Sequence, residues 1–166
     1  MTTETVATHN VTEQTAKAAP FDQELFELAS SVSADFSRNG SEPAGTVSVD
    51  WKNWLNTQIA RLEALEDNWD GYGADALAPA ALQRAHNFLE LVGKQAALPP
   101  KPWVSLTNGG GVWLEWDTSR VDFIIEIAPS GLVGAHAATP SFEFDGLLAE
   151  HLDDAKRAWA QLISDS

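Results

Sequence analysis

Residues 112–117 read Val-Trp-Leu-Glu-Trp-Asp, and residues 121–127 read Val-Asp-Phe-Ile-Ile-Glu-Ile. Successive side chains of a β-strand point to opposite faces, so each stretch would place every second residue on the same side. Only residues 118–120 separate the two stretches, and so short a connection predicts an antiparallel hairpin. The apolar face of this hairpin would consist of Val112, Leu114, Trp116, Phe123, Ile125 and Ile127.

Further short strands are predicted on either side of this hairpin, between turns rich in glycine and proline: 103–107, 132–137 and 141–145. Apolar residues at helical spacing mark three other segments: 50–65, 79–92 and 147–162. Asp50 is expected to cap the first of these helices, and Pro79 suits the first turn of the second. The order indicates an α+β fold. We predict an antiparallel β-meander of four to five strands, packed on one face by two to three helices.

The N-terminal quarter of the chain differs in composition from the rest. Residues 1–19 are rich in Thr, Glu, Ala and Gln, which predicts a disordered arm. Residues 20–46 contain a short amphipathic helix and a linker, and the helix is either tethered to the main domain or docked on it. Residues 47–166 form the single α+β domain. The first residues lack the basic start and apolar core of a signal peptide, which favours a cytoplasmic protein.

The chain is strongly acidic, with 24 Asp and Glu residues against 10 Lys and Arg residues and a formal net charge of −14. Such a charge repels nucleic-acid phosphates and anionic membrane surfaces, so neither is an expected direct partner. A basic protein is the expected partner instead. The sequence has no cysteine, which excludes disulfides, thiol catalysis and cysteine-based metal sites. No cofactor or metal is expected.

One acidic cluster belongs to the predicted sheet. The strand period places its carboxylates opposite the apolar face: Glu115, Asp117, Asp122, Glu126, Glu143 and Asp145. Trp113 shares this polar face with Glu115, and an exposed tryptophan among carboxylates resembles an interface anchor with an electrostatic rim. Two interpretations remain open at this point. The face is either a solvated surface that keeps the protein soluble or a surface that binds a partner.

A second acidic cluster surrounds the sequence Asn68-Trp-Asp-Gly-Tyr-Gly-Ala74. In the structural interpretation, the glycines permit positive φ angles, Asp70 caps a turn and Trp69 fills the core. In the functional interpretation, the loop binds a ligand or partner, with Asp67 nearby and with Asp70 and Tyr72 presented at its tip. The spacing of a calcium-binding loop is absent.

Signatures of catalysis are weak. The glycines at 109–111 are followed by a predicted strand and not by the Lys-Ser/Thr and helix of a phosphate-binding loop. The four histidines show no metal-ligand spacing, and no serine lies in a recognisable nucleophile elbow. Carboxylate pairs such as Glu115 and Glu126 could support acid–base chemistry, but carboxylates are so abundant that such a pair is expected by chance. We therefore expect no catalytic residues.

Three segments occur in an order and spacing that resemble a widespread bacterial family of small proteins. They are Asn68-Trp-Asp-Gly-Tyr-Gly-Ala74, Pro99-Pro-Lys-Pro-Trp-Val104 and Thr107-Asn-Gly-Gly-Gly-Val-Trp-Leu-Glu-Trp116. The family pattern is WDG-x-GA, then P-x-V, then T-x-x-GG-x-x-LEW, and the resemblance covers roughly residues 60 to 130. It implies a shared fold and no particular activity. The resemblance also associates the chain with mobile elements and with the neighbourhood of defence or toxin genes.

These observations favour a non-enzymatic interaction protein that binds and inhibits or neutralises a basic protein, including one that binds nucleic acid. An antitoxin, an anti-CRISPR protein or another anti-defence factor would fit, with carboxylates mimicking nucleic-acid phosphates. One alternative is a small ligand-binding or hydrolase domain that uses the loop from Asp70 to Tyr72. Another is a homodimeric structural protein that buries Trp113 and its neighbours between two copies.

Overall fold

The computed structural model describes residues 23–31 and 48–165. Within them, five strands form one antiparallel sheet whose spatial order follows the sequence. The strands are β1 Trp103–Leu106, β2 Val112–Asp117, β3 Asp122–Ile127, β4 Val133–Ala138 and β5 Glu143–Leu147. Consecutive strands pair with their neighbours throughout. The predicted meander is confirmed.

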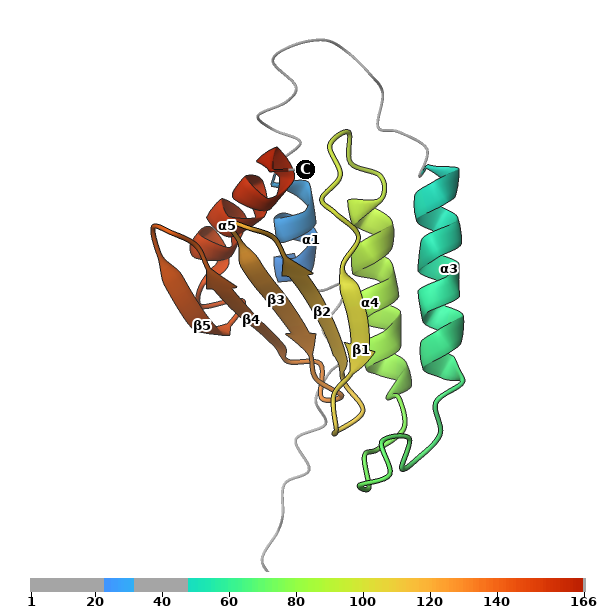
Figure 1. The fold of residues 1–166 in the computed structure, drawn as a ribbon. Helices are drawn as coiled ribbons and strands as arrows, with labels where there is room; N and C mark the ends of the chain where they lie inside the picture. The colour runs from blue at the N-terminus through green and yellow to red at the C-terminus, as the bar shows by residue number, and fades with distance from the viewer. Residues whose placement is uncertain (1–22, 32–47, 166) are drawn as a thin grey trace, which may run out of the picture.

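Four helices lie in the described residues: α1 Gln23–Ser30, α3 Val49–Glu63, α4 Pro79–Val92 and α5 Leu152–Ser164. Figure 1 shows α1 and α4 behind the sheet, α5 near β4, and α3 beside α4 past the β1 side, so the helices form one layer and the strands another. The α+β prediction is confirmed. The layer holds more helices than the expected two to three because α1 joins it. No helix in the described ranges combines the length and apolar character needed to cross a membrane.

The core lies between the two layers. Alternation along the strands buries one side chain in two, as the sequence predicted: Val104, Leu106, Val112, Leu114, Trp116, Phe123, Ile125, Ile127, Val133, Ala135, Ala137 and Phe144. Trp159 of α5 sits at the centre of an aromatic cluster, with its ring centroid 5.1 Å from that of Trp116 and 5.8 Å from that of Phe123. Phe88 of α4 lies 5.9 Å from the same ring. Large buried aromatics contribute much of a core's stabilisation. This cluster therefore fastens α4 and α5 over β2 and β3.

Helix α3 packs on α4 through Trp51, whose ring lies against Gly93 at the end of α4. The indole Nε1 of Trp51 donates a hydrogen bond to the Leu89 carbonyl at 2.9 Å. A Cβ atom at Gly93 would lie only 2.3 Å from this ring, so the glycine makes the packing feasible. The helix begins at Ser48, whose Oγ accepts from the Trp51 backbone N–H at 3.1 Å. The prediction that Asp50 caps this helix is therefore wrong, because Ser48 takes that role two residues earlier.

Helix α1 is docked on the helical layer, which settles the question that the sequence left open. Leu25, Leu28 and Ala29 are buried and belong to the same core cluster as the rest of the chain. Glu27 accepts a hydrogen bond from Lys156 of α5 at 3.0 Å. The predicted arm at residues 1–19, and most of the predicted linker up to residue 46, lie outside the described residues.

The last strand lies later in the sequence than predicted. Thr139 accepts hydrogen bonds at its Oγ1 from the backbone N–H groups of Ser141 and Phe142, at 3.2 Å and 3.1 Å. This turn occupies the start of the predicted strand 141–145, so pairing begins only afterwards. As a result, Leu147 belongs to β5 and not to the closing helix.

Candidate functional site

The sheet face turned away from the helices is the candidate site, and we call it the open face. Strand pairing arranges its side chains in three rows across the sheet. The row nearest the β1–β2 turn contains Ser105, Trp113, Glu126, Gly134 and Leu147. The middle row contains Trp103, Glu115, Ile124, His136 and Asp145. The third row contains Asp117, Asp122, Ala138 and Glu143. Each of these residues is half-buried or exposed.

The predicted sheet carboxylates all lie on this open face: Glu115, Asp117, Asp122, Glu126, Glu143 and Asp145. The five strands contain no lysine or arginine. Within residues 23–31 and 48–165, none of these carboxylates forms an ion pair. Arg120, in the turn after β2, pairs with Asp165 instead, at 3.4 Å. The open face therefore carries negative charge that the described part of the chain does not neutralise.

Two of these carboxylates stand directly opposite each other. Asp117 and Asp122 are cross-strand partners beside the β2–β3 turn. The Oδ1 atom of Asp122 is buried and has no hydrogen-bond partner among the described residues. Like charges in opposed positions destabilise a sheet by a few tenths of a kcal/mol up to ~1 kcal/mol. Folding alone does not account for this pair.

Trp113 lies on the open face as predicted, but it is half-buried and not freely exposed. Its indole Nε1 donates a hydrogen bond to Oε2 of Glu115 at 3.2 Å. Its cross-strand partners are Ser105 and Glu126. The ring therefore forms part of the floor of the face and orients one carboxylate beside it.

The most exposed aromatic residue of the open face is Trp103, which the sequence reasoning did not single out. Its side chain is 64% exposed, and its cross-strand partner is Glu115. Arg61 of α3 lies over the Trp103 ring, 5.7 Å from its centroid, and donates a hydrogen bond to the Val104 carbonyl. The alternation of β1 could have identified Trp103, because Val104 and Leu106 are buried and Trp103 must therefore face outward.

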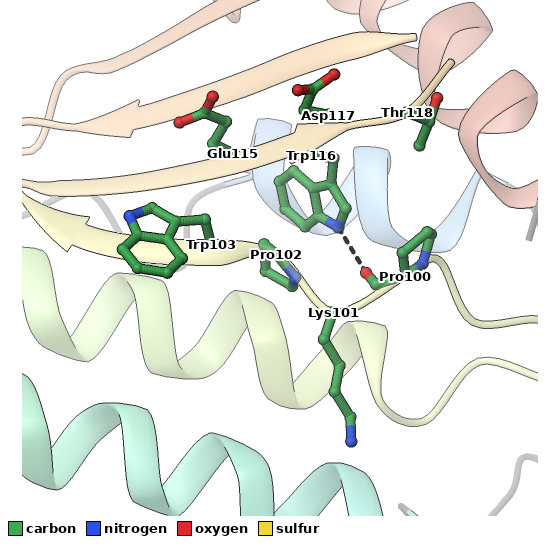
Figure 2. Close-up of a pocket in the computed structure, with 8 residues that line it drawn as sticks. All are labelled: Pro100, Lys101, Pro102, Trp103, Glu115, Trp116, Asp117 and Thr118. Carbon is green, nitrogen blue, oxygen red and sulfur yellow. Dashed lines mark hydrogen bonds between the residues drawn. The ribbon is translucent and has the colours of Figure 1, made fainter. Parts of the chain in front are cut away.

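A groove of about 510 Å³ lies at this edge of the face, where β1 begins and β2 ends (Figure 2). It is lined by Pro100, Lys101, Pro102, Trp103, Glu115, Trp116, Asp117 and Thr118. The indole Nε1 of Trp116 donates to the Pro100 carbonyl at 2.8 Å and so fixes the proline segment against the end of β2. Figure 2 shows Glu115 and Asp117 along one side of the groove and Trp103 with Pro102 along the other.

Two further depressions lie around Trp113. A groove of about 500 Å³ runs from it to the β1–β2 turn, with Glu126 and Pro129 in its lining. A smaller hollow of about 60 Å³ lies between Trp113 and His136, over the strand position of Gly134. The open face thus carries shallow grooves lined by aromatic and acidic side chains.

The second predicted cluster lies apart from the open face, in the loop between α3 and α4, which we call the 64–78 loop. Two of its carboxylates bond to the backbone of the loop itself. Asp70 Oδ1 accepts from the backbone N–H groups of Tyr72 and Ala74, at 2.8 Å and 3.1 Å. Asp67 Oδ1 accepts from the backbone N–H of Ala76 at 2.8 Å. The prediction that Asp70 caps a turn is confirmed.

Two aromatic residues of the 64–78 loop point outward. Tyr72 is 94% exposed and stands at the loop surface, as the functional interpretation expected. Trp69 is 36% exposed, so the prediction that it fills the core is wrong. The loop conformation explains the difference, because Asn68 has a φ of 62° and its Oδ1 accepts from Gly73 N at 2.8 Å. Trp69, the next residue, is therefore part of a locally closed turn and not of the core cluster.

The 64–78 loop is docked on the β1–β2 turn. The backbone N–H of Asp75 donates to the Asn108 carbonyl at 2.9 Å, and that of Ala78 donates to the Gly110 carbonyl at 2.9 Å. Gly110 has a φ of 78°, and a Cβ there would lie 2.4 Å from the Ala76 carbonyl oxygen. The 64–78 loop and the proline segment thus both bond to the stretch 107–116, the loop through backbone groups and the proline segment through the Trp116 side chain. These are the three segments that carry the family resemblance.

The electrostatics of the 64–78 loop follow from these bonds. Backbone donation, chiefly from the Tyr72 N–H, lowers the pKa of Asp70 from its ordinary value of 3.8. A general acid needs the opposite shift. No group of three or more His, Asp or Glu side chains in the described residues is arranged to hold a metal ion.

The sequence matches no protein-family model, and neither a curated protein nor a solved structure is similar enough to count as a relative.

Proposed function

We propose that the chain is a non-enzymatic interaction protein whose open face docks on the basic surface of another protein. The observation that carries this proposal is the set of six carboxylates on a helix-free sheet face, around Trp103 and Trp113, without a cation from the described residues to neutralise them. A basic partner would supply the missing opposite charge, and the aromatic residues would anchor it.

The biological setting that best fits is inhibition or neutralisation of a nucleic-acid-binding protein. Carboxylates spread over a flat face can occupy the positions of phosphates on such a protein, whose binding surface is already selected to be basic. An antitoxin, an anti-CRISPR protein or another anti-defence factor acting in the cytoplasm would use the face in this way. The same setting is suggested by the sequence pattern noted above, which resembles that of one bacterial family associated with mobile elements and with defence or toxin genes.

Neither alternative is favoured by a specific observation. A hydrolase using the 64–78 loop would need a free carboxylate with a raised pKa, whereas Asp70 is bound by backbone amides and its pKa is lowered. A symmetric dimer through the open face would bring two sets of like charges together, and opposed like charges are unfavourable.

The proposal is tested by charge reversal on the face. The full chain and its Glu115→Lys/Glu126→Lys variant are used as baits in the native host, with Glu66→Lys/Glu150→Lys as a control of equal charge change at exposed positions off the face. The partner lost only from the first variant is then purified, and its affinity is measured directly. We expect the open-face reversal to weaken binding at least ~10-fold and the control to change it less than ~2-fold.

Salt dependence provides a second measurement on the same complex. Affinity should fall steeply between ~50 and ~500 mM salt, because exposed charge pairs are screened within about a Debye length. An affinity that stays constant over this range, or that both variants reduce equally, would contradict docking through the open face.

A further inference from the structure

The groove between the Pro100–Trp103 segment and the end of β2 has an unusual combination of walls. One wall presents Glu115 and Asp117, which lie two residues apart on β2 and point to the same side of the sheet. The opposite wall presents the exposed ring of Trp103. Figure 2 shows Trp116 between the two walls, with its indole nitrogen bonded to Pro100.

The negative charge of this groove is not cancelled by its own lysine. Lys101 lines the groove, but its Nζ lies 2.5 Å from Oδ2 of Asp50 in α3. Figure 2 shows its side chain extending away from Glu115 and Asp117. Arg61 reaches Trp103 from α3, beyond the β1 edge, and is not part of the groove lining. The two carboxylates that line the groove therefore have no ion pair with the lysine of the same groove.

The carboxylate beside the tryptophan is also oriented. Oε2 of Glu115 accepts from Trp113 Nε1 at 3.2 Å, which fixes one oxygen of the carboxylate and leaves the other available. Trp103 and Glu115 are cross-strand partners, so their Cβ atoms lie roughly 5 Å apart on the same face. A planar cation could stack on the ring and hydrogen-bond to the carboxylates at the same time.

We propose that this groove is a receptor for one arginine side chain of the basic partner, an inference that rests on the proposed function and names the chemistry of its contact. A guanidinium is planar, stacks on aromatic rings and carries several donors in a fork that matches carboxylates. A lysine ammonium offers a compact charge without the planar surface. Charge complementarity and the tryptophan wall together select arginine over lysine.

The test uses the full chain, labelled for nuclear magnetic resonance and titrated with the peptide acetyl-Gly-Arg-Gly-amide. Two matched peptides carry lysine or the neutral isostere citrulline in place of arginine. We expect the side-chain Nε1–H resonance of Trp103 to shift with the arginine peptide, with the lysine peptide at least ~3-fold weaker and citrulline without effect. Trp103→Ala and Glu115→Gln/Asp117→Asn should each weaken arginine binding ~10-fold, the former being read from neighbouring resonances.

The control is Glu143→Gln/Asp145→Asn, which removes two carboxylates from β5 at the other edge of the same face. It should change the affinity for the arginine peptide less than ~2-fold. Equal binding of the arginine and lysine peptides, or equal losses in the groove and control variants, would overturn the inference.

Failure of this inference can be told apart from failure of the proposed function. If the arginine peptide shows no preference for the groove while Glu115→Lys/Glu126→Lys still abolishes binding of the purified partner, the arginine receptor is wrong and the docking face stands. If the groove selects arginine while no partner depends on the open face, the receptor stands and the proposed function is wrong.

Discussion

The open face and the 64–78 loop have similar compositions and opposite uses for their carboxylates. In the 64–78 loop, Asp67 and Asp70 accept hydrogen bonds from backbone N–H groups and thereby hold the chain in its turn. On the open face, Glu126 and Asp117 accept no hydrogen bond and form no ion pair among the described residues. The loop carboxylates hold the local backbone, whereas Glu126 and Asp117 contribute mainly negative charge to the face.

This difference shows how to separate structural from functional acidity. A carboxylate that is bonded to nearby backbone amides has a local reason for its presence. A carboxylate that stands opposite another one, as Asp117 does opposite Asp122, has a local reason to be absent. Substitutions in the two regions should therefore change stability in opposite directions, which gives three tests of the comparison.

The largest effect is expected for Gly110→Ala, at the contact between the 64–78 loop and the β1–β2 turn. The new Cβ would meet the Ala76 carbonyl oxygen at 2.4 Å, and the positive φ of 78° is unfavourable for alanine. We expect a loss of about 2–3 kcal/mol in the free energy of unfolding, measured by urea denaturation. Gly109→Ala is the control, since nothing lies within 4 Å of its Cβ, and it should change stability by less than ~0.5 kcal/mol. Equal effects of the two substitutions would mean that the loop is not docked as described.

A smaller, pH-dependent effect is expected for Asp70→Asn. The backbone bonds hold the folded pKa of Asp70 below its ordinary value of 3.8, so folding favours the ionised carboxylate. Its contribution is complete above pH 3.8 and is lost as the pH falls through the lower folded pKa. Wild type should therefore be more stable than the variant at neutral pH, and the gap should close in acid. Urea denaturation across this range measures the gap, and a gap that stays constant with pH would contradict the structural role of the charge.

The smallest effect, of opposite sign, is expected for Asp117→Asn on the open face. The substitution removes the repulsion with Asp122 and adds an amide that can donate a hydrogen bond to it. We expect the free energy of unfolding to rise by about 0.5 kcal/mol in thermal or urea denaturation. Asp153→Asn, in the first turn of α5, is the control and should lower stability slightly because it removes a favourable charge near the helix N-terminus. A loss of stability in Asp117→Asn would show that the fold itself uses this carboxylate.

The sequence was sufficient to predict the sheet and its two faces. The period of two along 112–127 determines which residues are buried, and short turns leave few ways to connect neighbouring strands. The residues of the open face followed from the same period. The docking of α1 could not be predicted, because its apolar stripe indicates burial without indicating against what.

The sequence was less informative about side chains whose contacts come from a distant part of the chain. The exposure of Trp103 depends on where β1 begins. Its contact with Arg61 depends on a helix more than forty residues earlier in the sequence. Trp69 follows Asn68, which has a positive φ. Asparagine adopts this conformation less often than glycine, so the sequence did not indicate it. The groove itself depends on the bond between Trp116 and Pro100, and no local pattern encodes that contact.

The two edges of the sheet bear on whether the chain can carry exposed aromatics and still remain dispersed. An unpaired edge strand is a template for joining another chain edge to edge. At β1, the Arg61 guanidinium donates a hydrogen bond to the Val104 carbonyl, which is then less available to another strand. At β5, the exposed carboxylates of Glu143 and Asp145 make the approach of a second copy unfavourable. Both routes to polymerisation are thereby discouraged. The fold can therefore expose an aromatic and acidic surface without acting as a template for its own aggregation.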